Sequence, residues 1–113
     1  MTLIKFNKEK KKFRWTNHIK EKIKEYQLSE KRLIKIFRNP ERIEEGIVPG
    51  TFAVMQRAGT KKHPYEIWLM YQIKSSEIVM ISAWKYPGKT SPKEAPPIPT
   101  DILETLEKIS KKN

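Results

Sequence analysis

Apolar residues near the start of the chain recur at helical spacing. They lie on one stripe, which predicts a helix over Asn17–Tyr26 with Thr16 as its N-cap. The residues of this stripe are Trp15, Ile19, Ile23 and Tyr26. Because buried stripes of this kind normally form a core, we expect the helix to pack on another element.

A second helix is indicated directly afterwards. Ser29 is a favourable N-cap, and Leu28 can contact Leu33 to form a hydrophobic staple. Asn39-Pro40 ends the helix, because a residue before proline avoids helical backbone angles. The expected apolar face is Leu33, Ile34 and Phe37, and the expected solvent side is Lys31, Arg32, Lys35 and Arg38.

After Pro40 the hydrophobic period changes from helical to two. This change predicts four strands joined by short turns, which favours an antiparallel meander. The expected strands are Ile43–Val48, Thr51–Arg57, Tyr65–Ile73 and Glu77–Lys85. Pro49-Gly50 suits a type II turn between the first two, and the loop from Ala58 to Pro64 is basic.

Alternation along the third strand separates two faces. The set Tyr65, Ile67, Leu69, Tyr71 and Ile73 is the better candidate to lie under the two helices. The opposite set, Glu66, Trp68, Met70 and Gln72, is amphipathic and is expected to be accessible.

These elements define an α+β fold: two N-terminal helices packed on one face of a four-stranded antiparallel meander, a proline-rich strap and a short C-terminal helix. Thr100 or Asp101 is expected to cap that last helix. The expected organisation is a basic N-terminal arm at 1–14 with a short strand or apolar anchor at Leu3–Phe6, an α+β domain at 15–85, the strap at 86–99 and the helix at 100–113.

The positive charge is polarised along the chain. The first 38 residues hold thirteen Lys and Arg against four Glu, which is nine of the eleven excess positive charges. A concentrated basic field attracts polyanions, of which RNA and DNA are the usual ones. The Lys8–Arg14 run is equally consistent with a solvated arm and with direct phosphate contacts.

Composition excludes several classes of chemistry. The chain has no Cys and only two His, His18 and His63, and its acidic residues show no calcium-loop pattern. We therefore expect neither metal nor other cofactor. No apolar run reaches the length of a membrane span, so no membrane partner is expected and the default location is cytoplasmic.

Short motifs resemble those of small bacterial toxins. The stretch 18–33 followed by Asn39-Pro40 resembles BrnT-like members of the RelE superfamily, which have a His near the first helix and an Asn-Pro stop after the second. Gln27-Leu28-Ser29 occupies the position of their Gly-Ile/Leu-Ser joint, and 81–85 resembles their Ile-Ser-Ala-Arg strand. The resemblance covers roughly Trp15 to Lys85.

This resemblance implies a metal-independent endoribonuclease that cleaves mRNA and is inhibited by an antitoxin, for which an acidic protein is the expected type. In such enzymes a ribose 2′-OH attacks the adjacent phosphate, assisted by a base, an acid and cations. Trp84 stands where the family has an Arg that would carry charge, so Trp84 and Trp68 are instead candidates to stack on unpaired bases.

Candidate residues follow from these roles. The catalytic candidates are His18, Arg57, His63, Lys85 and Tyr86. The nucleic-acid-binding candidates are Lys10, Lys11, Lys12, Arg14, Lys22, Lys61, Lys62, Trp68 and Trp84. The expected partner is RNA or the ribosome. The alternatives are a non-catalytic RNA- or ribosome-binding protein on the same scaffold, and a protein-interaction module that uses the strap and last helix.

Overall fold

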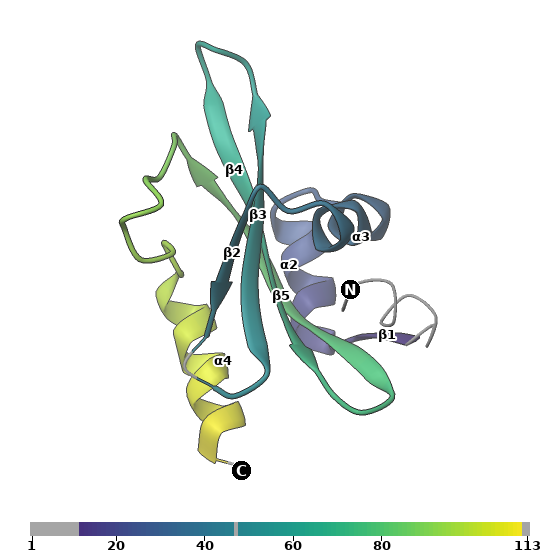
Figure 1. Cartoon of the computed structure of the whole chain (residues 1–113). Coiled ribbons are helices and arrows are strands. Elements are labelled where there is room, and N and C mark those ends of the chain that lie inside the picture. The colour runs from purple at the N-terminus through teal and green to yellow at the C-terminus, as the bar shows by residue number, and fades with distance from the viewer. Residues whose placement is uncertain (1–11, 47, 112–113) are drawn as a thin grey trace.

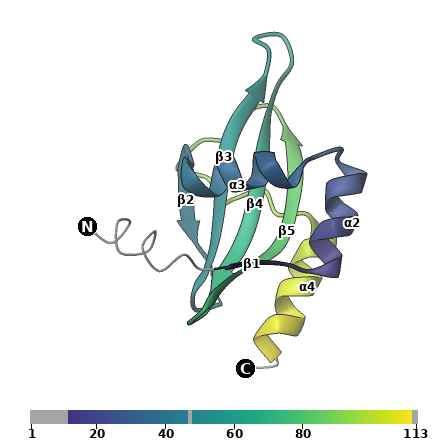
Figure 2. The same cartoon turned by 90° about the vertical axis from the view of Figure 1, so that its right-hand side faces the viewer.

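A five-stranded sheet lies between two layers of helix (Figures 1 and 2). The computed structural model describes residues 12–46 and 48–111. Its elements are β1 (Lys12–Trp15), α2 (Asn17–Glu25), α3 (Glu30–Arg38), β2 (Arg42–Glu45), β3 (Thr51–Gly59), β4 (Pro64–Ile73), β5 (Glu77–Pro87) and α4 (Thr100–Lys111). The expected strand or anchor at Leu3–Phe6 and the candidates Lys10 and Lys11 lie outside the described residues.

The sheet corrects the expected four-stranded antiparallel meander. Its strand order is β1-β5-β4-β3-β2, and β1 pairs parallel to β5 with Lys12 opposite Glu77 and Trp15 opposite Met80. Phe13 and Trp15 pack against the core on the side of α2 and α3, whereas Lys12 and Arg14 are exposed. Trp15 is therefore the end of a fifth strand rather than part of a helical stripe.

Side-chain caps begin α2 and α3, as predicted. Thr16 Oγ1 accepts from the backbone N–H of Ile19 at 3.1 Å, and Ser29 Oγ accepts from that of Arg32 at 3.0 Å. The Thr16 hydroxyl also lies 3.1 Å from the carbonyl oxygens of Met80 and Ile81, to one of which it donates. Thr16 thus holds the start of α2 on β5.

The joint between the helices uses a left-handed residue. Gln27 has a φ of 56°, and the N–H of Leu28 donates back to the carbonyl of Ile23 at 2.8 Å. This is the helix-ending arrangement in which glycine is usually found. Gln27 therefore adopts the backbone conformation for which glycine is favoured at the joint.

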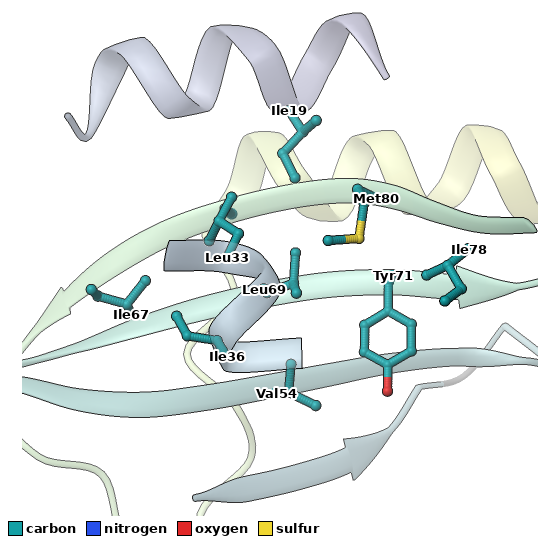
Figure 3. Close-up of a cluster of buried hydrophobic side chains, with 10 residues drawn as sticks. Ile19, Leu33, Ile36, Val54, Ile67, Leu69, Tyr71, Ile78 and Met80 are labelled. Atoms are coloured by element: carbon teal, nitrogen blue, oxygen red, sulfur yellow. The ribbon is translucent and has the colours of Figure 1, made fainter. Parts of the chain in front are cut away.

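The face of the sheet under α2 and α3 carries the first core cluster (Figure 3). Ile67, Leu69 and Tyr71 of β4 belong to it, which confirms the predicted helix-facing set for these residues. Ile73 of the same set is 38% exposed. The helices contribute Ile19, Leu33 and Ile36, all fully buried, and Phe37 meets the ring of Tyr71 edge-on at 4.8 Å.

The opposite face is covered, contrary to expectation. Glu66, Trp68, Met70 and Gln72 are all buried. The strap and α4 pack over the first three, and Gln72 donates to the Pro49 carbonyl. Their side of the sheet forms a second core cluster of Ala53, Met55, Trp68, Met70, Val79, Ile81, Trp84 and Ile102, with Ile98 and Leu106 packed against it. The pairing register between β4 and β5 shifts between Met70 and Tyr71. This shift interrupts the alternation of β5 side chains between the two faces of the sheet.

Buried polar contacts attach the strap to the sheet. The Glu66 carboxylate accepts from the Thr90 backbone N–H at 2.7 Å and from its hydroxyl at 2.9 Å. Arg42 donates to the Thr90 hydroxyl at 3.0 Å and to the carbonyl of Glu94. These contacts satisfy buried charges that would otherwise oppose folding.

Because Thr16 has two structural roles and Ser29 has one, their replacements should differ in effect. We expect Thr16→Ala to lower the free energy of unfolding by about 2–3 kcal/mol, since the cap and the bond to a β5 carbonyl are both lost. Ser29→Ala should lower it by about 1 kcal/mol. Urea denaturation measures both values, and equal losses would contradict the role of Thr16 on β5.

Candidate nucleic-acid interface

The loop between β3 and β4 is an ordered basic turn that projects beyond the rest of the sheet (Figure 1). The N–H of Thr60 donates to the carbonyl of His63 at 3.3 Å, and the N–H of His63 donates to Thr60 Oγ1 at 3.1 Å. Gly59 has a φ of 83°, and a Cβ there would lie 2.3 Å from the His63 carbonyl oxygen. The tight turn therefore requires glycine at this position.

This turn presents three of the predicted residues together. Lys61, Lys62 and His63 are all exposed at its tip, and Arg57 is exposed on β3 below it. The segment from Arg57 to Tyr65 contains no Asp or Glu. We call residues 57–65 the basic hairpin.

The other predicted catalytic residues near the hairpin point to different faces. Arg57, Glu66 and Tyr86 lie on one rung of the sheet, and Tyr86 packs against the second core cluster on the α4 side. Lys85 is half-buried, with its ammonium group 5.2 Å from the centre of the Tyr65 ring, which packs against the first cluster. Lys85 and Tyr86 therefore do not converge on one phosphate.

His18 lies far from the basic hairpin. Its Nε2 is 2.8 Å from Ser82 Oγ, and Ser82 is fully buried on β5. Pro87 of β5 pairs with Tyr65 at the base of the hairpin. Ser82 lies roughly 17 Å from Pro87 along the same strand. Burial and the neighbouring Lys22 ammonium lower the pKa of His18, which favours its neutral imidazole.

Lys22 links α2 to the first turn of α4. Its ammonium group donates to Glu25 at 2.9 Å and to Asp101. Burial opposes its charge, but these two hydrogen bonds outweigh that effect and raise the pKa of Lys22. The hydrogen bond from Lys22 lowers the pKa of Asp101. With two carboxylate partners and a buried side chain, Lys22 has a structural role and does not face solvent as a phosphate ligand.

Trp68 and Trp84 are not exposed to bases. Both side chains are fully buried, and their rings stack on one another at 5.9 Å with an angle of 3° between the planes. Trp68 Nε1 donates to Glu66 at 3.0 Å, and the Arg42 guanidinium lies 5.3 Å from the Trp68 ring centre. The pair is part of the second core cluster, so neither residue can stack on an RNA base in this conformation.

At the β1 edge, the exposed candidates Lys12 and Arg14 face solvent. Arg14 Nε lies 3.1 Å from a Glu77 carboxylate oxygen. This ion pair crosses from β1 to β5 and partly neutralises Arg14. Such exposed pairs contribute little to stability, but they reduce the attraction of the arginine for an external phosphate.

A second cationic surface lies on α3, which crosses β3 and β4 on the face away from α4 (Figure 2). A hollow along this helix is lined by Ser29, Lys31, Arg32, Ile34, Lys35 and Arg38. We call it the α3 groove. The sequence indicated its four cations as the solvent side of a helix within the basic first 38 residues, a segment that it favours as a docking surface for RNA, the ribosome or an acidic antitoxin. Their spacing of three and four residues was the available signal, because such residues share one face.

Within residues 12–46 and 48–111, no group of three or more His, Cys, Asp or Glu side chains could hold a metal ion. In the same ranges, no helix is both long and apolar enough to cross a membrane.

Comparison with known proteins gives no match. No protein-family model, no curated protein and no solved structure is significantly similar to this chain. The resemblance to BrnT-like toxins therefore rests on the short sequence motifs alone.

The environment of His18 predicts a pH dependence of stability. Because its pKa is lowered by folding, the unfolded chain binds this proton first, so stability should fall as the pH drops below the ordinary value of 6.5. We expect His18→Gln, which does not titrate, to reduce this loss between pH 7 and pH 5. The exposed His63→Gln is the control and should retain it. Urea denaturation across this range tests both, and identical pH profiles for wild type and His18→Gln would contradict the assignment.

Proposed function

We propose that this protein binds RNA through the basic hairpin. The supporting observation is an ordered, projecting turn that carries Lys61, Lys62 and His63 beside Arg57, with no carboxylate in the same segment. Within the described residues, the side chains of Arg57, Lys61 and Lys62 make no ion pair, so their charges are open to phosphate. The toxin resemblance supports RNA as the nucleic acid.

The fixed shape of the turn favours binding. A preorganised loop loses little conformational entropy when it meets a ligand, so more of the electrostatic attraction contributes to affinity. The same cationic turn also fits an acidic protein partner such as an antitoxin, which would compete with RNA for it.

Replacing the two hairpin lysines should weaken RNA binding selectively. We expect Lys61→Gln/Lys62→Gln to reduce affinity for a mixed-sequence single-stranded RNA oligonucleotide by about tenfold. The slope of log K against log salt should fall in magnitude by about 1.4, as expected for two lost phosphate contacts. Fluorescence anisotropy at several salt concentrations measures both quantities.

A matched control separates local contact from net charge. Lys89→Gln/Lys93→Gln removes the same charge from two exposed strap residues and should change affinity by less than about twofold if hairpin contacts dominate. Equal losses in the two double variants would refute the assignment to the hairpin.

Cleavage is the second candidate function, favoured by the position of His63 beside two lysines. A neutral His63 imidazole would take the proton of a ribose 2′-OH as its oxygen bonds to phosphorus. The imidazolium would then protonate the 5′-oxygen as its bond to phosphorus breaks, while Lys61 and Lys62 neutralise the phosphorane oxygens. His18 is too distant to share this phosphate.

Incubation of the protein with RNA in EDTA tests cleavage. If the hairpin is catalytic, we expect fragments that end in 2′,3′-cyclic phosphate and 5′-OH, and His63→Gln should reduce the rate by about 100-fold or more. His18→Gln should retain cleavage. Intact RNA at high protein concentration would exclude this reaction and leave the binding proposal as the function.

A further inference from the structure

The α3 groove contains cations that no other part of the described chain neutralises. Arg14, Lys22 and Arg42 each form an ion pair with a carboxylate. Across residues 12–46 and 48–111, the side chains of the four groove cations form none. These are Lys31, Arg32, Lys35 and Arg38, and no Asp or Glu lines the groove beside them.

One donor in the groove is buried and lacks an acceptor. Arg32 Nε is removed from solvent and has no hydrogen-bond partner within the described chain. Buried guanidinium donors are normally satisfied, because an unmade hydrogen bond is expensive in a low-dielectric environment. Among the described residues, the Ser29 hydroxyl is used only as an acceptor for the Arg32 backbone N–H, so its proton remains available to donate.

The charge in the first turn of α3 opposes the helix dipole, although Lys35 and Arg38 in the last turn suit it. Lys31 and Arg32 lie in the first turn, where the helix dipole already places positive charge, and only Glu30 compensates there. Lys31 and Lys35 are also like charges one turn apart, which repel. An anion bound in the groove would relieve both effects, so the free helix carries repulsion that a ligand removes.

The groove has the length of a chain of phosphates. Lys31 and Arg38 are separated by roughly 10 Å along the helix axis, which exceeds the reach of one phosphate group. The Arg38 end lies beside the hairpin, since the Asn39 carbonyl accepts from Gln56 Nε2 at 2.8 Å and Glu41 accepts from the Arg57 N–H at 2.8 Å. The Arg38 end of the groove therefore adjoins the base of the hairpin on β3, where the Glu41 carboxylate also lies.

The helix also holds its cations in fixed positions. Leu33 and Ile36 are fully buried beneath α3, and Phe37 packs edge-on against Phe13 at 5.4 Å. We propose that the α3 groove is a binding site for the phosphodiester backbone of single-stranded RNA, which continues from there to the hairpin. This inference rests on the proposed RNA-binding function and adds a second site to it.

A pair of double variants with equal charge change tests the groove. Lys31→Gln/Lys35→Gln removes two groove lysines one turn apart, and Lys20→Gln/Lys24→Gln removes two exposed lysines with the same spacing on α2. By anisotropy with single-stranded RNA, the groove variant should lose about tenfold in affinity and about 1.4 in salt slope. The α2 control should lose less than about twofold. The groove variant should also unfold at the same or a higher temperature, because like-charge repulsion is reduced.

A charge-conserving variant tests the hydrogen bond separately. Arg32→Lys keeps the positive charge but removes the Nε–H, and we expect it to lose about fivefold in RNA affinity. Arg14→Lys is the matched control at β1 and should be close to wild type. Titration with sodium tripolyphosphate should shift the Arg32 Nε–H resonance in NMR spectra, assigned by its loss in Arg32→Lys.

The outcomes separate this inference from the proposed function. Equal losses for the groove and α2 double variants, with RNA still bound through the hairpin, would overturn the groove site and leave the function. Absence of RNA binding by the wild type, with a tripolyphosphate shift at Arg32, would overturn the RNA function and support a polyphosphate-binding groove. Failure of tripolyphosphate to move the Arg32 resonance would overturn the groove as an anion site.

Discussion

Burial of β4 and β5 on both faces is the constraint on which the rest of the structure depends. Ile67 and Leu69 face α2 and α3, while Trp68 and Met70 face the strap and α4, and all four are buried. A sheet with two apolar faces needs a cover on each. Neither broad face of the sheet is therefore open to a ligand. A large partner can contact the sheet edges, the outer sides of the helices and the projecting hairpin (Figure 1).

The second cover is held by few but specific contacts. Ile102 is the only fully buried residue among the described side chains of α4, so apolar packing of that helix is modest. Glu66 and Arg42 compensate by binding Thr90 and the Glu94 carbonyl of the strap. Charge-assisted hydrogen bonds of this kind are stronger than neutral ones. Glu66 and Arg42 also contact Trp68, whose ring stacks on that of Trp84, so both aromatic residues form core here and make no nucleic-acid contact.

Local sequence signals predicted the structural features that depend on residues close together in the chain. The caps Thr16 and Ser29 and the basic turn at 58–64 follow from side-chain chemistry within a few residues. The strand β1 was missed because its alternating Phe13 and Trp15 adjoin a helical stripe, and its partner β5 lies far along the chain. Parallel pairing at such separation leaves no local pattern.

Contacts with distant segments also explain why some predictions about the candidate site were wrong. Glu66 and Gln72 made one face of β4 resemble an accessible surface, but the partners that bury them, Thr90 and the Pro49 carbonyl, lie on other segments. The sequence also made His18 a catalytic candidate together with His63, whereas Ser82 holds it on a part of β5 that is distant from the hairpin. How far apart two candidate residues lie in space depends on the register of the strands that carry or hold them. Composition does not determine that register.

This packing divides the cations of the chain into those that pair with carboxylates and those that do not. Arg14 and Lys22 pair with carboxylates on elements that are distant in sequence, and Arg42 pairs with Glu44 of its own strand. These matched charges contribute little field outside the protein. Among the described residues, the side chains of the α3 and hairpin cations form no ion pair. Because Asn39 and Glu41 hold the end of α3 against Gln56 and Arg57 of β3, the α3 cations and the hairpin adjoin at the hairpin base. An adjacent set attracts a flexible polyanion more strongly than the same net charge spread over the surface, since one strand can contact every member at once.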